Sequence, residues 1–367
     1  STLFPYTTLF RSDGDANGNG NANDEIPWSG SWEGSQQRMM MLNAFGFATS
    51  GNLADNIALD YNRNAVYIPL TDEYVNYLKF MNKCYTEGLL DQDIFAQDDT
   101  QFKAKAAEGI IGTAAYAAPF LMDPENHMSW VALAMVSQAG RKPVTYKGHL
   151  TTIGKYIVTD KCEYPDVAVR WANLFYAPEY AFYIMYGPEY GTDQDPDGIG
   201  TTIELDEQGN YKGVLTPGYD KDKMTLWDYY AQNHPVYSNF NFGIDDSYIF
   251  NSLFKGRPTN VEELTASHKK SLDSGEGNLN EAWWRYNNLI TAVPHATFGY
   301  TISYFSDDIQ AKIDELKTPL EDYVKMTEAK FISGAMSIDD KYNEFIAELE
   351  KLGAKEYQQI FIDAYKG

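Results

Sequence analysis

The sequence predicts an α/β fold. Short apolar stretches typical of strands are interspersed with helical patterns early in the chain, and the last third is mostly helical in pattern. A length of 367 residues and a hydrophobic content of 44% suit about two to three domains with substantial cores. No repeat of fixed period is evident in the sequence.

The early part of the chain is predicted to contain a helix followed by short strands. A helix is expected over residues 72 to 87, where apolar residues recur at spacings of three and four and Gly88 follows as the C′ residue. Its recurring apolar residues are Tyr74, Leu78, Met81 and Tyr85. The apolar stretch from Ile110 to Ala117 is expected to form a strand, and the alternating stretch from Val144 to Val158 two more.

The middle of the chain is predicted to contain a second helix and then a surface excursion. Pro165 is expected to open the helix at its first position. Its inner face would carry Val167, Trp171, Leu174 and Phe175, which places Trp171 in the core. The stretch from Asp193 to Asp222 is rich in Asp, Gly and Pro, and a hairpin is expected around Gln208 to Asn210.

The last third is predicted to form consecutive helices. Ser306 is expected to begin a helix that stops and restarts at Thr318 to Glu321, because these residues resemble a capping box with Pro319 at the first helical position. Ser337 is expected to cap the next helix, which Gly353 closes before a final helix. The apolar residues of these last two helices are Tyr342, Phe345, Ile346, Leu349 and Leu352, then Tyr357, Ile360, Phe361 and Ala364.

Charge and composition exclude several classes of partner. With 29 basic and 52 acidic residues the formal charge is −23, which repels nucleic acid and anionic lipid surfaces. No apolar run approaches the ~18 residues that a membrane-spanning helix needs. Cys84 and Cys162 fit no C-x-x-C motif and are expected to be buried or unreactive thiols.

The first twelve residues, STLFPYTTLFRS, differ from the rest of the chain. They contain TLF twice, lack any acid and begin without Met, and they resemble a translated sequencing adapter. We therefore exclude residues 1–12 from the fold. The remainder is expected to be a fragment truncated at its N-terminus.

The stretch DGDANGNGNANDEIPW at residues 13 to 28 combines acids, amides and glycines in the way that a calcium loop requires. Two registers fit. One EF-hand-type register uses Asp13, Asp15, Asn17, Gly18 and Asp24. The other uses Asp15, Asn17, Asn19, Gly20, the Asn21 carbonyl and Asn23, closed by Asp24 or Glu25. A solvated linker of the same composition is the alternative.

Signatures of catalysis are sparse. The sequence contains no H-E-x-x-H, G-x-S-x-G or Walker motif, and its five histidines never pair at metal-ligand spacing. Carboxylate pairs of the kind used in glycoside hydrolysis arise by chance among 52 acids, so their presence does not identify an enzyme.

Aromatic residues in polar settings are candidates for stacking on sugar rings, with ordinary packing as the alternative for each. Trp28 and Trp32 follow the predicted calcium loop closely, so a bound ion could fix their backbone. The other candidate rings are Tyr186 in YGPEYG and the adjacent Trp283 and Trp284. Glu189 and Arg285 would orient the ligand, and the Arg285 fork suits a uronic carboxylate. Adjacent helical residues point about 100° apart, so at most one of Trp283 and Trp284 is expected to face a ligand.

Five segments, in their order along the chain, resemble those of extracellular solute-binding proteins of family 1. More narrowly, they resemble the large lipoproteins that deliver oligosaccharides to ABC importers, including the alginate-binding branch. The segments are DANGNGNANDEIP, YIPLTDEYVNYLKFMNKCYTEGLLDQDIF, RWANLFYAPEY, YGPEYG and KFISGAMSIDDKYNEFIAELEKLGAKEYQQIFIDAYKG. The resemblance implies a two-lobed, type II periplasmic-binding-protein-like fold with its first lobe incomplete. Residues 13–145 and 236–367 would build one lobe, and 146–235 would contribute to the other.

The resemblance also implies a function. The chain would bind an oligosaccharide between its lobes, carry out no reaction and pass the ligand to the permease subunits of an ABC importer. It would be a monomer held at the outer cell surface by an N-terminal lipid anchor that this fragment lacks. The alternatives are a calcium-dependent glycoside hydrolase or polysaccharide lyase, and a calcium-stiffened adhesin.

For the calcium loop the resemblance favours the second register and a structural ion. Its ligands would be Asp15, Asn17, Asn19, Asn21, Asn23 and Asp24. Asn23 stands where an acid is usual, which lowers the negative charge around the ion.

Overall fold

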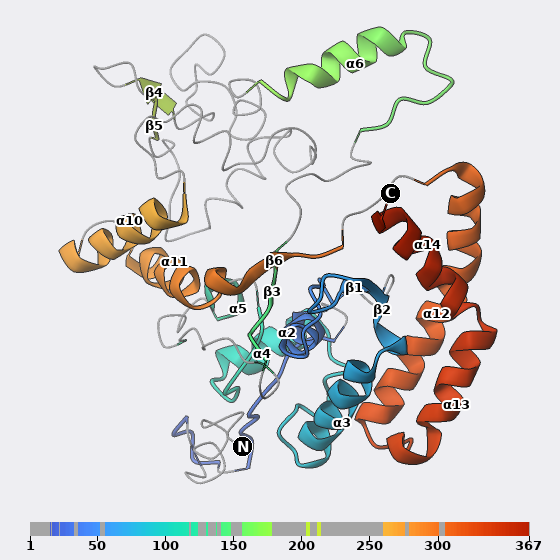
Figure 1. Cartoon of the computed structure of the whole chain (residues 1–367). Helices are drawn as coiled ribbons and strands as arrows, with labels where there is room; N and C mark the ends of the chain where they lie inside the picture. Colours follow the sequence, from blue (N-terminus) through green and yellow to red (C-terminus); the bar gives the residue numbers. More distant parts are fainter. Residues whose placement is uncertain are drawn as a thin grey trace. The chain divides into compact units, whose positions relative to one another are not determined.

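A computed structural model describes residues 15, 17–21, 23–32, 36–51, 56–116, 119–123, 130, 137, 141–147, 156–177, 203–205, 211–213, 260–275, 279–300 and 305–366 (Figure 1). The chain divides into two compact units. Unit 1 comprises Ser1–His149 and His268–Gly367, and unit 2 comprises Leu150–Ser267. The predicted lobe boundaries at residues 145 and 235 stay a prediction.

The first elements of unit 1 are a helix, a hairpin and a second helix. Helix α2 (Gln36–Ala44) precedes strands β1 (Ile57–Leu59) and β2 (Ala65–Tyr67), which pair antiparallel with Ile57 opposite Tyr67. A short 3-10 turn, η1 (Ile68–Leu70), leads into α3 (Asp72–Thr86). The predicted helix over residues 72 to 87 is thus confirmed, with two acids in its first turn and Gly88 at a φ of +68° just after its end.

Helices α4 (Asp99–Ala107) and α5 (Pro119–Met122) follow. The strand predicted from Ile110 to Ala117 is replaced, within residues 110–116, by isolated parallel bridges between Ile26 and Ile111 and between Ser29 and Ala114. In a regular strand, the residues that hydrogen-bond to one neighbouring strand lie two positions apart. Ile26 and Ser29 are three positions apart, so their bridges do not join into a continuous ladder.

The second half of unit 1 includes the end of α10 (Val261–Ser274), then α11 (Leu279–Thr291), a 3-10 turn η3 (Val293–His295) and β6 (Ala296–Phe298). Strand β6 pairs in parallel with β3 (Thr145–Lys147). Only this one of the two strands predicted between Val144 and Val158 is found in the described residues, since residues 148–155 lie outside them.

In unit 2 the structure describes α6 (Pro165–Leu174) and the antiparallel strands β4 (Ile203–Leu205) and β5 (Tyr211–Gly213). The helix beginning at Pro165 and the hairpin are confirmed. The predicted inner face of α6 is wrong, because Trp171 is 45% exposed and Val167 and Leu174 are exposed as well. Trp171 instead packs edge-on against Phe175, which is buried, with ring centroids 4.7 Å apart.

The C-terminal helices are α12 (Asp307–Ile332), α13 (Ile338–Lys351) and α14 (Ala354–Lys366). The predicted break at Thr318 to Glu321 is wrong, since α12 continues through Pro319. Leu316, Leu320 and Val324 continue one buried face across this point. Pro319 itself is exposed, so water can satisfy the carbonyl that loses its partner there.

The predicted start of α13 and the boundary before α14 are confirmed. The Ser337 side chain accepts a hydrogen bond from the Asp340 N–H, and Gly353 adopts a φ of +90° between the two helices. Helices α12, α13 and α14 pack on one another and against α3 or β2 (Figure 1). None of the helices in the described ranges combines the length and apolarity that crossing a membrane requires.

The largest core cluster of unit 1 gathers side chains from α2, α3 and the three C-terminal helices, and it includes Cys84. Burial raises the pKa of the Cys84 thiol to about 12, so this cysteine is unreactive at neutral pH, as predicted. Cys162 is also free and lies half-buried.

A fully buried ion pair crosses this core. Arg38 on α2 donates two parallel hydrogen bonds to Glu328 on α12, at 2.8 and 3.0 Å, and both side chains are at most 1% exposed. Tyr74 of α3 donates to the same carboxylate, and Arg38 also donates to Asn56 and to the Gly51 carbonyl. Burial alone would lower the pKa of Arg38, but the charge and hydrogen bond of Glu328, with smaller contributions from Tyr77 and Tyr74, together raise this pKa above its ordinary value. The Arg38 guanidinium therefore stays charged at any ordinary pH.

Glu328→Gln should destabilise the protein by about 3–5 kcal/mol, because it leaves the Arg38 charge buried without its counter-ion. Urea unfolding followed by circular dichroism measures this loss. Asp322→Asn, at an exposed position of the same helix, is the matched control and should change stability by less than about 0.5 kcal/mol. Equal midpoints for the two variants would contradict a structural role for the pair.

Pro319→Ala should stabilise the protein by about 1–3 kcal/mol, because alanine restores the hydrogen bond and removes the ring clash within a continuous helix. Thermal unfolding of this variant and of the neighbouring exposed control Thr318→Ala measures the gain. If the helix instead restarted at Pro319, Pro319→Ala would leave the stability of the protein unchanged or lower it.

Candidate functional site

The predicted calcium loop is a compact turn rather than an extended strand. The side-chain oxygens of Asn17, Asn19 and Asn21 each accept a hydrogen bond from the backbone N–H two residues further on. These bonds run from Asn19 to Asn17, from Asn21 to Asn19 and from Asn23 to Asn21, at 3.0, 2.8 and 3.2 Å. We call residues 15–25 the Asp/Asn loop.

Two further contacts draw the ends of the Asp/Asn loop together. The Gly20 N–H donates to Asp15 Oδ2 at 3.0 Å, and Asn19 Nδ2 donates to Asp24 Oδ2 at 2.8 Å. Gly18 and Gly20 adopt φ values of +73° and +89°, which other residues rarely do. Asp15 and Asp24 are thus bound to the same central turn.

The chemistry of the Asp/Asn loop fits a hard cation. Among the described residues, Asp15 Oδ1 and Asp24 Oδ1 are buried oxygens without a hydrogen-bond donor. No three acidic, histidine or cysteine side chains of the described part gather as a metal cluster. Calcium, however, takes six to eight oxygens that include amide and backbone carbonyls, and each asparagine oxygen retains a second lone pair. Asp13, which the first register needs, lies outside the described residues.

The Asp/Asn loop continues directly into a segment held by the core. The Ile26 N–H donates to the Ile110 carbonyl at 2.8 Å, and the Gly112 N–H donates to the Ile26 carbonyl at 2.9 Å. Two residues later, the Trp28 carbonyl accepts from the Asp91 N–H at 2.8 Å. The position of the loop therefore depends on residues 26–32.

Gln37 of α2 joins this segment to the Ala115 backbone by three hydrogen bonds. Its Oε1 accepts from Trp28 Nε1 at 2.8 Å and from the Ala115 N–H at 3.1 Å, and its Nε2 donates to the Ala115 carbonyl at 2.7 Å. A Cβ on Gly30 would lie 2.0 Å from Gln37 Nε2, so only glycine fits at position 30. Gln37 and Gly30 therefore act together in locking the segment.

A buried polar network holds the other side of the segment. Asp91 accepts hydrogen bonds from the Ser29 hydroxyl, Gln97 Nε2 and Lys105 Nζ. Burial would raise the pKa of Asp91, but the bonds from Ser29 and Lys105 outweigh it and lower this pKa. Asp91 is therefore a carboxylate at neutral pH, and its partners satisfy it within the scaffold.

The structure places the two tryptophans that follow the Asp/Asn loop in the core. Trp28 is 2% exposed and Trp32 is 5% exposed. Trp32 packs edge-on against Phe95 with ring centroids 4.9 Å apart. Neither indole offers an open face for a sugar ring here.

The remaining predicted ligand-binding residues fall into two groups. Tyr186 and Glu189 lie outside the described residues. Trp283, Trp284 and Arg285 lie together on α11, where both indoles are half-buried and the guanidinium is exposed. The Arg285 guanidinium carbon lies 5.6 Å from the centre of the Trp284 ring. An indole and a planar cation thus share one surface of α11.

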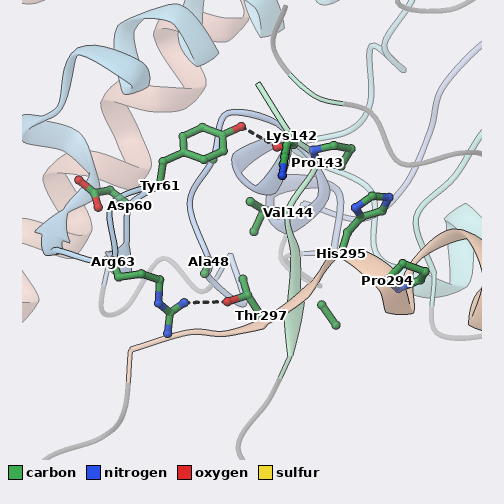
Figure 2. A pocket seen from close by; sticks show the side chains of 12 residues that line it. Ala48, Asp60, Tyr61, Arg63, Lys142, Pro143, Val144, Pro294, His295 and Thr297 are labelled. Carbon is green, nitrogen blue, oxygen red and sulfur yellow. Dashed lines mark hydrogen bonds between the residues drawn. The ribbon is translucent and has the colours of Figure 1, made fainter. Parts of the chain in front are cut away.

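Sequence reasoning missed an open pocket of about 250 Å³ in unit 1 (Figure 2). It lies between the residues that follow α2, the turn that joins β1 to β2, the three residues before β3, and the stretch from η3 to β6. Tyr61 donates to the Lys142 carbonyl at 3.0 Å, and Arg63 donates to Thr297 Oγ1 at 2.8 Å. Because its walls come from segments far apart in the chain, no local motif signals this pocket.

Comparison with known proteins identifies one curated relative. Over 363 residues the chain is 24% identical to the fructooligosaccharide ABC transporter substrate-binding protein FusA of Streptococcus pneumoniae serotype 4. The match covers 96% of this chain and 60% of FusA, so the chain spans about three fifths of that relative's length. No protein-family model matches the chain.

Solved structures share its fold. An EF-hand mutant of S. pneumoniae FusA in complex with fructo-nystose matches with a TM-score of 0.70 at 20% identity, over 99% of this chain and 67% of that one. An HMO-binding, ABC-transporter-associated solute-binding protein of Bifidobacterium longum infantis matches with a TM-score of 0.65 at 15% identity, over 98% of this chain and 67% of that one. The alginate-binding protein AlgQ2 without calcium ion matches at 0.60 and 13%, over 99% and 67%. The chain therefore has the α/β fold of the solute-binding proteins of ABC transporters, which confirms the resemblance predicted from its sequence.

Proposed function

We propose that this chain is the substrate-binding component of an ABC importer and binds an oligosaccharide without chemically changing it. The observation that carries the proposal is the match to FusA, which extends over 96% of the chain and agrees with the shared fold. The same relationship supports a location at the outer cell surface and delivery of the ligand to permease subunits. Attachment through a lipid anchor and a monomeric state belong to the proposal.

Trp284 and Arg285 are the proposed centre of the saccharide-binding surface. A sugar ring presents C–H groups that pack on an aromatic face, and the half-buried Trp284 provides such a face on α11. Arg285 is exposed and lies close enough to that ring for a cation–π contact, so an aromatic face and a planar cation occur side by side on α11. Tyr186 and Glu189 remain proposed contacts.

Trp28 and Trp32 receive a different role in this proposal. Their burial, and the Trp28 hydrogen bond to Gln37, favour a supporting function beneath the Asp/Asn loop over direct stacking on a sugar. Trp283, which is turned about 100° from Trp284 around the same helix, is proposed to support the helix rather than the ligand.

Trp284→Ala should weaken oligosaccharide binding by about 30-fold, the effect typical of losing an aromatic anchor of about 2 kcal/mol. Isothermal titration calorimetry with fructooligosaccharides and a panel of neutral and uronic oligosaccharides measures this. The exposed Trp171 of α6 supplies the control variant Trp171→Ala, which should bind as the parent chain does. A parent chain that binds no member of the panel would contradict the proposed function.

Calcium is the proposed structural ion of the Asp/Asn loop. The two buried carboxylate oxygens without donors, the left-handed glycines and the asparagine oxygens support it. The bond from Gly20 to Asp15 supports the second register, with Asp15, Asn17, Asn19, Asn21, Asn23 and Asp24 as ligands. The EF-hand mutant of FusA and the calcium-free form of AlgQ2 indicate that calcium matters in similar proteins. The ion would fix the loop ahead of Ile26 and supply no chemistry.

Calcium at about 10 mM should stabilise the chain by about 1.4–2.7 kcal/mol relative to chelator, for a dissociation constant of about 10⁻⁴ to 10⁻³ M. Differential scanning calorimetry measures the shift. Asp15→Asn should abolish it, whereas Asn23→Asp should lower the calcium concentration needed, because it adds a negative ligand. Asp322→Asn, far from the loop in sequence, should respond as the parent does. An unchanged response in Asp15→Asn would contradict the site.

A further inference from the structure

We propose that the pocket in Figure 2 binds the carboxylate of an acidic sugar residue, which makes uronic-acid-containing oligosaccharides the preferred ligand class. This inference rests on the proposed function. All of the lining residues belong to unit 1, so the pocket is complete within one compact unit.

The pocket concentrates positive charge in a strongly acidic chain. Arg63 and Lys142 carry the charge and line the pocket from two separate segments, in a protein with 52 acidic and 29 basic residues, and the His295 imidazole lines it from a third. Within the described part of the chain, the Lys142 ammonium and the His295 imidazole make no ion pair or side-chain hydrogen bond. Both groups are thus available to an anion.

The one acid among the lining residues, Asp60, is already engaged. Its Oδ1 accepts from the Asn62 and Asn64 N–H groups at 2.9 and 2.8 Å, and its Oδ2 accepts from Asn64 Nδ2 at 3.2 Å. These bonds shape the turn between β1 and β2. The negative charge of Asp60 is therefore partly offset, and an incoming carboxylate meets mainly donors.

The Arg63 guanidinium is held in place before any ligand arrives. One of its terminal nitrogens donates both to Thr297 Oγ1 at 2.8 Å and to the Phe298 carbonyl at 2.7 Å. The backbone of Arg63 adopts a φ of +64°, an uncommon conformation for a residue with a side chain. The remaining guanidinium donors form a preorganised edge, the geometry that suits a carboxylate.

The walls of the pocket are rigid and partly apolar. Tyr61 is fixed by its bond to the Lys142 carbonyl and by the Arg141 guanidinium, 4.6 Å from its ring centre. A Cβ on Gly46 would lie 1.8 Å from that ring, so glycine lets the wall close. Figure 2 shows Ala48 and Val144 between the charged residues. Apolar surface beside fixed cationic donors fits the C–H face and the carboxylate of one sugar acid.

The test compares trigalacturonate with the same trisaccharide after its carboxylates are reduced to alcohols. Calorimetry on the full chain should show trigalacturonate binding at least about tenfold more tightly, the effect expected of one charge-assisted hydrogen bond. Lys142→Gln should remove most of this preference and leave the affinity for the reduced sugar unchanged. Lys147→Gln, which removes one exposed charge from β3 outside the pocket lining, is the matched control and should keep the preference.

A site-specific readout separates binding in this pocket from binding elsewhere. Two-dimensional imidazole NMR, with the His295 signals assigned through His295→Gln, should show them shifting with trigalacturonate and not with the reduced sugar. Inorganic phosphate is the second probe. If phosphate shifts these signals with equal affinity and competes with trigalacturonate, the pocket is a general oxyanion site and the assignment to sugar acids is overturned.

The remaining outcomes distinguish this inference from the proposed function. Equal affinity for the two trisaccharides, or tight binding of neutral oligosaccharides alone, would overturn the acidic-sugar assignment and leave the oligosaccharide-binding function standing. Failure of every oligosaccharide in the wider panel to bind would instead overturn the proposed function itself.

Discussion

The buried pair between Arg38 and Glu328 is the constraint on which the rest of unit 1 depends. It joins helices through residues that lie 290 positions apart in the chain. The two side chains stay together because burying either charge without its partner would cost about 3–5 kcal/mol. Arg38 thereby fixes α2 on the C-terminal helices. The preceding residue, Gln37, then holds Trp28 and the Ala115 backbone from the same helix. The ordered conformation of the Asp/Asn loop thus depends on the contact between α2 and the C-terminal helices.

This dependence explains why a loop of acids and amides can have a defined shape in a chain of charge −23. Asparagine side chains close successive turns, and residues 26–32 are anchored by the hydrogen bonds from Trp28 to Gln37 and from Ser29 to Asp91. A calcium ion would need to order only the loop itself, because the segment that follows is already fixed. Preorganisation of this kind lowers the entropy lost on binding.

Local signals in the sequence predict much of the fold but little of the site. The helix caps at Ser337 and Gly353 and the apolar spacing of α3 are properties of neighbouring residues, so those elements follow from sequence. Pro319 wrongly suggests a helix break, because the packing of the buried face of α12 against other helices stabilises the helix by more than one lost hydrogen bond costs. The polar surroundings of Trp28 and Trp32 suggest exposed rings, whereas distant partners such as Gln37 and Phe95 bury them. The pocket lined by Arg63, Lys142 and His295 exists only after three segments meet.

The central claim is that the chain binds an oligosaccharide and leaves it intact, and native mass spectrometry after prolonged incubation with a bound oligosaccharide tests it most directly. The account predicts a complex whose mass equals the chain plus one whole oligosaccharide, with calcium retained, and a free pool of unchanged length. Shortened sugars would show an enzyme and contradict the account, whether they are hydrolysed fragments or the unsaturated fragments, one water lighter, that a lyase leaves.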